Sequence, residues 1–217
     1  MKFPNESPEY RRARDELLEA EISLRRQVEK VAAQRRRLPP GGEVPEDYAF
    51  EGDEGSVRLS QLFGRHHTLV AYSFMYGPKM AKACPSCTSI VDALDGEAPH
   101  ILQRASFVVI ARVPLARMRE HAKSRGWSHA RLLSSERNSY NRDYGAETPD
   151  GSQVPMLNVF RKDGGKVRHF WGSELLDAKT EDPTQDPRHV DAIWPLWNVL
   201  DVTPEGRGTD WNPKLAY

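Results

Sequence analysis

The chain has 217 residues, 38% of them hydrophobic, and its 31 Lys and Arg residues balance 31 Asp and Glu residues. This neutral balance argues against a nucleic-acid-binding protein driven by a basic field, and the longest clean apolar run, 107–111, is far shorter than the roughly 20 residues of a membrane span. The N-terminus lacks the apolar segment of a secretory signal, so we expect a cytoplasmic protein with no nucleic-acid or membrane partner.

A long amphipathic helix is predicted over residues 8–37, because apolar residues recur there at spacings of three and four. Ser7 can cap its start, and a Pro- and Gly-rich linker over 38–42 follows it. We therefore expect an N-terminal helical arm and linker over 1–42 and a main domain over 43–217. The apolar stripe can dock on that domain or on a second copy of the chain in a homodimer. It consists of Tyr10, Ala13, Leu17, Ala20, Leu24, Val28 and Val31.

Short strands and helices alternate after residue 47. Their order predicts an α/β protein with a central mixed sheet flanked by helices. A helix is expected to start at the cysteines, with Cys84 at its N-cap and Pro85 at its first position, and another at 190–200 would contain Pro195, which can kink it. The expected strands are 47–50, 56–59, 68–75, 107–111, 131–134, 156–160 and 167–171, and a further helix is expected at 115–125.

The only two cysteines, Cys84 and Cys87, are spaced C-x-x-C between a buried strand pattern and a helix pattern. At a helix start, unpaired backbone N–H groups and the helix dipole favour a thiolate at Cys84, and Lys79 and Lys82 could lower its pKa further. Cys87 lies one turn further in and is suited to resolving a mixed disulfide. The pattern predicts a catalytic dithiol that needs no cofactor, with Cys84 as the nucleophile.

Two other interpretations compete with the dithiol. A zinc site needs about four ligands, and the histidines that could join two cysteines lack the usual paired spacing, so we expect no metal. The cysteines could also be reduced structural thiols. For the tryptophans, core packing is favoured over lining a ligand pocket. The histidines are His66, His67, His100 and His169, and the tryptophans are Trp171, Trp194 and Trp197.

The order of these parts resembles the thioredoxin superfamily, and the segment 50–64 resembles the additional N-terminal hairpin of its peroxiredoxin branch. In that superfamily, the proline before the last hairpin is cis and packs against the dithiol, which implies this role for Pro155. From about Tyr10 to its end, the chain is similar to a bacterial family of thioredoxin-like domains of unknown function described as predicted dithiol-disulfide oxidoreductases. The similar segments are 47–50, 72–78, 84–87 and 201–207.

The chain departs from the best-known members at several positions. Ala83 stands where thioredoxin has Trp, and eight positions separate Tyr76 from Cys84. Gly77 and Ala81 occupy the Pro and Thr/Ser places of the peroxiredoxin pattern P-x-x-x-T/S-x-x-C, so a peroxide site of that type is not supported. We expect a thiol–disulfide oxidoreductase acting on a protein or small-molecule disulfide or dithiol. The alternatives are a thiol peroxidase using a sulfenic acid at Cys84 and a non-catalytic interaction module.

Overall fold

The computed structural model describes all residues except 1, 179–187 and 209. The chain divides into two compact units, 1–40 and 41–217. Among the described residues, no helix is both long enough and apolar enough to cross a lipid bilayer.

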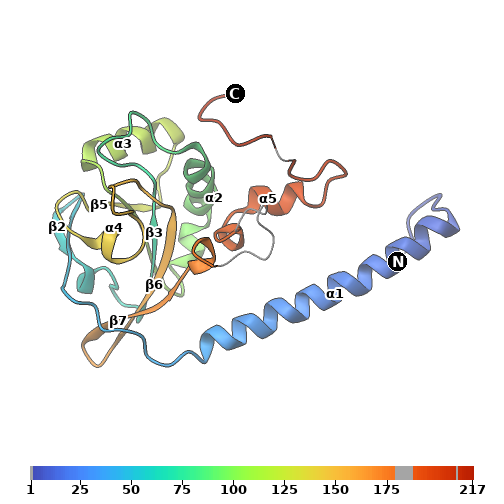
Figure 1. The fold of residues 1–217 in the computed structure, drawn as a ribbon, viewed down its shortest axis with the longest axis horizontal. Coiled ribbons are helices and arrows are strands. Elements are labelled where there is room, and N and C mark those ends of the chain that lie inside the picture. The colour runs from blue at the N-terminus through green and yellow to red at the C-terminus, as the bar shows by residue number, and fades with distance from the viewer. Residues whose placement is uncertain (1, 179–187, 209) are drawn as a thin grey trace. The chain divides into compact units, whose positions relative to one another are not determined.

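The first unit contains one helix, α1 (Pro8–Arg36) (Figure 1). It begins where the Ser7 hydroxyl accepts the N–H of Tyr10 at 3.1 Å, which satisfies one of the unpaired donors of the first turn. Two arginines in its last turn complement the negative end of the helix dipole. None of its residues is buried.

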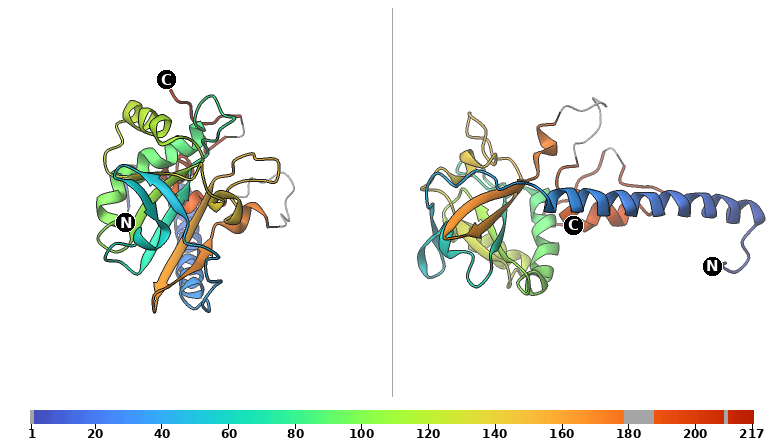
Figure 2. Two further views of the ribbon diagram at one scale, coloured as in Figure 1. Left: turned by 90° about the vertical axis from the view of Figure 1, so that its left-hand side faces the viewer. Right: turned by 90° about the horizontal axis from the view of Figure 1, so that it is seen from below.

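The second unit is built on a mixed sheet of seven strands in the order β2-β1-β5-β4-β3-β6-β7. Strands β3, β4 and β5 are parallel, and β6 runs antiparallel to β3. The β6–β7 hairpin forms one edge of the sheet and the β1–β2 hairpin the other (Figures 1 and 2). The strands are β1 (Ala49–Gly52), β2 (Gly55–Arg58), β3 (Thr68–Ser73), β4 (Ser106–Ala111), β5 (Arg131–Ser134), β6 (Met156–Asp163) and β7 (Lys166–Gly172).

Hydrophobic cores cover both faces of this sheet. On β4, Val109 packs into the core beneath the helices α2, α3 and α5, while Val108 packs into the opposite core with the turn η1 and the helix α4. Burial on both faces explains why the central strands are apolar almost throughout. The helical elements that pack on the two faces are α2 (Pro85–Ile101), α3 (Leu115–Arg125), α5 (Pro195–Leu200), η1 (Leu59–Gln61) and α4 (Tyr140–Asp143).

The expected thioredoxin-like α/β fold is confirmed. A parallel β3–α2–β4 unit is extended by the antiparallel β6–β7 hairpin on β3, and α5 packs beside α2 (Figure 1). The hairpin turns through Gly164 and Gly165, whose φ values of 56° and 83° explain the Gly-Gly pair, because a tight two-residue turn requires positive φ at both positions.

The predicted helix over 190–200 is wrong in its first half. A short 3-10 turn (Asp191–Ile193) comes first, and α5 begins at Pro195 instead of being kinked there. Proline has no N–H to donate and disfavours helical backbone in the residue before it, and Trp194 accordingly has φ −119° and ψ 86°.

A carboxylate at the middle of α2 ties this helix to the segment before β5. Asp95 Oδ1 accepts the backbone N–H groups of Ser128, His129 and Ala130 at 3.1, 2.9 and 2.8 Å. Burial acts to raise the pKa of Asp95, but these donors together hold it below its usual value. The contact therefore stabilises the fold as long as the carboxylate is ionised.

We expect Asp95→Ala to lower the free energy of unfolding by about 2–4 kcal/mol at neutral pH, because three N–H donors lose a charged acceptor. The difference from the wild-type chain should persist above the ordinary carboxyl pKa of about 4 and shrink as the pH falls through the lowered value. Urea unfolding at pH 7 and in acid measures both. Equal midpoints at pH 7 would contradict this role.

Candidate active site

Cys84 and Cys87 lie in the first turn of α2. Cys84 is the N-cap residue, with φ −64° and ψ 125°, and its Sγ accepts the N–H of Cys87 at 3.5 Å. Pro85 occupies the first helical position, where its missing N–H costs nothing. Cys84 is half-buried and Cys87 is buried, so solvent reaches only the first sulfur well.

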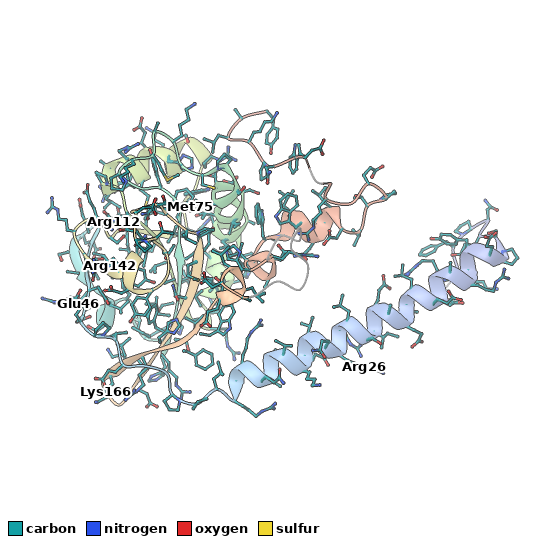
Figure 3. All side chains as sticks on the ribbon, viewed as in Figure 1. Arg26, Glu46, Met75, Arg112, Arg142 and Lys166 are labelled. Atoms are coloured by element: carbon teal, nitrogen blue, oxygen red, sulfur yellow. The ribbon has the colours of Figure 1, made fainter. Side chains whose placement is uncertain are left out.

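The long loop between β3 and Cys84 folds back, so that Cys84 still lies at the end of this strand. The N–H of Cys84 donates to the carbonyl oxygen of Met75 at 3.0 Å, just beyond β3 (Figure 3). Arg117 of α3 donates to the carbonyl oxygens of Met80 and Ala81 at 2.9 and 3.3 Å, which holds the loop against the helix. The eight-position spacing is therefore compatible with a cysteine at a helix start.

The two thiols have opposite pKa shifts. The pKa of Cys84 is lowered to about 6, chiefly because the Cys87 thiol donates to its sulfur, and also because backbone N–H groups of Cys87 and Ser86 do so against the effect of burial. Burial raises the pKa of Cys87 well above its usual value. At neutral pH, Cys84 is therefore a thiolate and Cys87 a thiol.

The two lysines expected to assist Cys84 do not account for its lowered pKa, which comes from groups of α2 itself. Lys79 instead donates to the carbonyl oxygen of Asp150 at 3.2 Å. The backbone N–H groups at the start of α2 and the Cys87 thiol lower the pKa of Cys84, an effect that the sequence interpretation assigned partly to Lys79 and Lys82.

A tyrosine hydroxyl lies beside the inner sulfur. Tyr72 of β3 is fully buried, and its hydroxyl interacts with the Cys87 thiol. The hydroxyl lies near this sulfur but makes no hydrogen bond within the described part of the chain. Burial raises the pKa of Tyr72, so the phenol keeps its proton and can only donate or accept a hydrogen bond there. Sequence reasoning missed this residue, because it is one aromatic residue in an apolar strand.

Hydrogen bonds of Thr88 and His121 hold the first turn of α2 against α3. The Thr88 hydroxyl donates to the carbonyl oxygen of Cys84 at 2.9 Å, and His121 Nε2 lies 3.0 Å from the same hydroxyl oxygen. Since the hydroxyl has spent its only proton, His121 must donate from Nε2. Burial lowers the pKa of His121, which favours this neutral form, and the ring packs against Phe74 and Trp127. Thr88 and His121 therefore position the backbone of Cys84.

A pocket of about 220 Å³ opens beside the two cysteines. We call it the dithiol pocket. Part of its wall comes from the segment before and within α5, which lies far from the cysteines in sequence. Trp194 and Trp197 belong to the core, as expected, but they also face this pocket. Its wall includes Cys84, Ser86, Cys87, Pro155, His189, Trp194 and Trp197.

Pro155 lies in this wall with the cysteines, but the expectation that its peptide bond is cis is wrong. No peptide bond is cis in the described part of the chain. Trans is the lower-energy form of an X-Pro bond. The backbone groups on both sides of this bond have hydrogen-bond partners in the trans structure. The N–H of Val154 donates to the Ala146 carbonyl oxygen at 2.9 Å, and the Pro155 carbonyl oxygen accepts from His189 Nε2 at 3.0 Å.

The histidines considered as zinc ligands interact elsewhere. His66 Nε2 lies 3.0 Å from the Leu102 carbonyl oxygen, and His169 Nε2 lies 2.9 Å from Asn158 Oδ1. His67 is 3.3 Å from the Lys162 carbonyl oxygen, and His100 is in the last turn of α2. Over the described residues, no group of three or more His, Cys, Asp or Glu side chains could hold a metal ion.

Comparison with known proteins gives one family. The family model described as "Bacterial protein of unknown function (DUF899)" matches residues 1–217. A search of curated proteins found no match.

Solved structures similar to the chain share little sequence with it. Peroxidoxin BcpB from Mycobacterium tuberculosis is 19% identical, with 76% of this chain and 99% of that chain covered and a TM-score of 0.47. Peroxiredoxin Q from Xanthomonas campestris is 15% identical, with 72% and 97% covered and a TM-score of 0.47. A peroxiredoxin-like protein from Aquifex aeolicus is 13% identical, with 72% and 84% covered and a TM-score of 0.46.

The opposite pKa shifts predict unequal alkylation of the two cysteines. In Cys87→Ser, where a hydroxyl still donates to Cys84, labelling of Cys84 by iodoacetamide should be half-maximal near pH 6, the pKa to which the thiol is lowered. In Cys87→Ala, which removes that donor, the midpoint should rise by about one pH unit. In Cys84→Ser, Cys87 should resist labelling at neutral pH. Similar, ordinary titration of both cysteines would contradict the nucleophile assignment.

Proposed function

The chain belongs to the DUF899 family, and we propose that this member is a thiol–disulfide oxidoreductase in which Cys84 attacks and Cys87 resolves. The observation that carries the proposal is the asymmetry of the pair. One sulfur is ionised at neutral pH and half-exposed beside a pocket, and the other is protonated, buried and adjacent to it. A dithiol enzyme needs these two different sulfurs.

In the first step, the Cys84 thiolate attacks one sulfur of a substrate disulfide. A bond forms between Cys84 Sγ and that sulfur, the substrate S–S bond breaks, and the other substrate sulfur leaves as a thiolate that takes a proton from water. The amides of the first turn of α2, which lower the pKa of Cys84, keep its sulfur ionised and therefore ready to attack at neutral pH.

In the second step, Cys87 loses its proton and attacks Cys84 Sγ. The Cys84–Cys87 bond forms, the mixed disulfide breaks, and the departing substrate sulfur takes a proton. The substrate gains two electrons and the protein loses two, so a reducing thiol or dithiol must restore Cys84 and Cys87. The high pKa of Cys87 opposes this step. The Tyr72 hydroxyl is placed to donate to the Cys87 sulfur as it becomes negative.

In this proposal, the substrate binds in the dithiol pocket. Cys84, Pro155 and Trp194 contribute apolar and polar surface around the attacking sulfur. The Pro155 carbonyl is held by His189, which fixes this part of the wall relative to Cys84. The substrate we propose for this pocket is a disulfide or dithiol of a small molecule or of an exposed protein segment.

The proposal predicts one reversible disulfide per chain. In a series of glutathione redox buffers followed by alkylation, intact mass should show Cys84 and Cys87 oxidised together in a single transition, and reduced protein should catalyse reduction of insulin disulfides. Cys84→Ser should abolish both. Turnover of hydrogen peroxide without disulfide reductase activity would favour the peroxidase and overturn the proposal. No reversible disulfide would leave only the interaction module.

The role of Tyr72 can be separated from that of Cys84. With a chromogenic aromatic disulfide as substrate, the first thiolate released reports attack by Cys84, and the second reports resolution by Cys87. We expect Tyr72→Phe to slow the second release about tenfold, the effect of losing one hydrogen bond to a charged group, and to leave the first unchanged.

Tyr140→Phe is the matched control. Its hydroxyl is equally buried and likewise makes no hydrogen bond in the described part of the chain, but the groups near it are Ser73 and Asn158 and not a cysteine, and its ring belongs to the core on the opposite face of the sheet. Both releases should keep their wild-type rates in this variant. Equal slowing of the second release by the two substitutions would show that Tyr72 acts only through packing.

A further inference from the structure

The helix α1 carries a continuous apolar face that nothing in its own unit covers. Leu17 is 50% exposed, Leu24 66% and Val28 59%. Large aliphatic side chains are more stable when they are removed from water than when they are left exposed. The helix has 29 residues and is roughly 43 Å long, and most of the stability of a protein helix comes from packing of its apolar face.

The spacing of this face is that of a coiled coil. Tyr10, Leu17, Leu24 and Val31 are each seven residues apart, the repeat of one heptad position, which we call a. Ala13 and Ala20 follow at the d position, three residues after an a residue, and two glutamines, Gln27 and Gln34, continue the d series. A strict seven-residue repeat favours pairing with another helix over packing on an irregular surface.

The sizes of these residues favour antiparallel pairing of two copies. In a parallel pair, leucines would meet leucines and alanines would meet alanines, leaving alternate layers crowded and empty. In an antiparallel pair centred on Ile22, Leu24 of one copy packs against Ala20 of the other, and Val31 against Ala13. Every large side chain then faces a smaller one, and the two-fold symmetry closes the assembly at two copies.

The charges agree with this orientation. Residues 8–22 hold five acidic and three basic side chains, a net charge of −2, whereas residues 23–37 hold one acidic and six basic side chains, a net charge of +5. Antiparallel pairing places Glu16 beside Lys30 of the other copy. Parallel pairing would place Glu16 beside Glu21, and Lys30 beside Arg35. Neither the Glu16 side chain nor the Lys30 side chain makes a hydrogen bond or ion pair within the described part of the chain.

We propose that α1 is a dimerisation arm that forms an antiparallel coiled coil with α1 of a second copy of this chain. The apolar stripe forms the seam, and the unequal charge of the two halves sets the direction. The arm and the dithiol belong to different compact units of the chain, so substitutions in one can be tested for their effect on the other.

Light scattering on the full chain tests the assembly. The wild-type chain should have twice the 24.7 kDa mass of one copy at micromolar concentration. Leu24→Asp, in the seam, should give a monomer, because a charge would be buried without a partner. The matched control Leu18→Asp, an exposed leucine of the same helix outside the stripe, should stay dimeric. An unchanged alkylation midpoint of Cys84 would show that the second unit remains folded.

Disulfide trapping tests the direction in a chain with Cys84→Ser and Cys87→Ser. Antiparallel pairing brings the two copies of Ser23 together, so Ser23→Cys should crosslink rapidly, and Arg26→Cys, at the c position of the repeat that points away from the seam, should not. Glu16→Lys should weaken the dimer, and adding Lys30→Glu should restore it. A monomeric wild-type chain, equal effects of Leu24→Asp and Leu18→Asp, or preferential crosslinking of Arg26→Cys would overturn the proposal.

Discussion

The hydrogen bonds that converge on Cys84 Sγ are the constraint on which the site depends. They require a helix that starts at residue 84 and a second thiol within its first turn. The backbone bond from Cys84 to Met75 fixes this start at the end of β3, and the Thr88–His121 pair holds it from α3. The sheet and the helices over it therefore serve to place a single ionised sulfur at the surface and a neutral one directly beneath it.

Much of this arrangement could be predicted from local patterns. The apolar run of β3, the C-P-S-C sequence and the Gly-Gly turn of the last hairpin each encode their structure within a few neighbouring residues. The start of α5 could have been predicted too, because Pro195 favours a helix start over a kink. The cis expectation for Pro155 came from resemblance alone, and the bond is trans.

The rest of the site could not be predicted, because its partners are distant in sequence. Tyr72 and Cys87 meet across a strand and a helix, His121 reaches Thr88 from α3, and His189 reaches Pro155 from the segment before α5. Each of these residues looks ordinary in its own segment. These residues come into contact only because strands and helices that are distant in sequence pack together in the fold. A single sequence gives no direct signal for such long-range contacts.

The depth of the inner sulfur has a consequence for survival under oxidative stress. Any oxidant arriving from solvent meets Cys84 first, since Cys87 is 1% exposed. An oxidised Cys84 then has a thiol already beside it, and condensation within the same turn competes with further oxidation to sulfinic and sulfonic acids, which cells rarely reverse. The burial that raises the pKa of Cys87 therefore also keeps this thiol reduced and available to form a disulfide with an oxidised Cys84. This disulfide would protect Cys84 from irreversible oxidation.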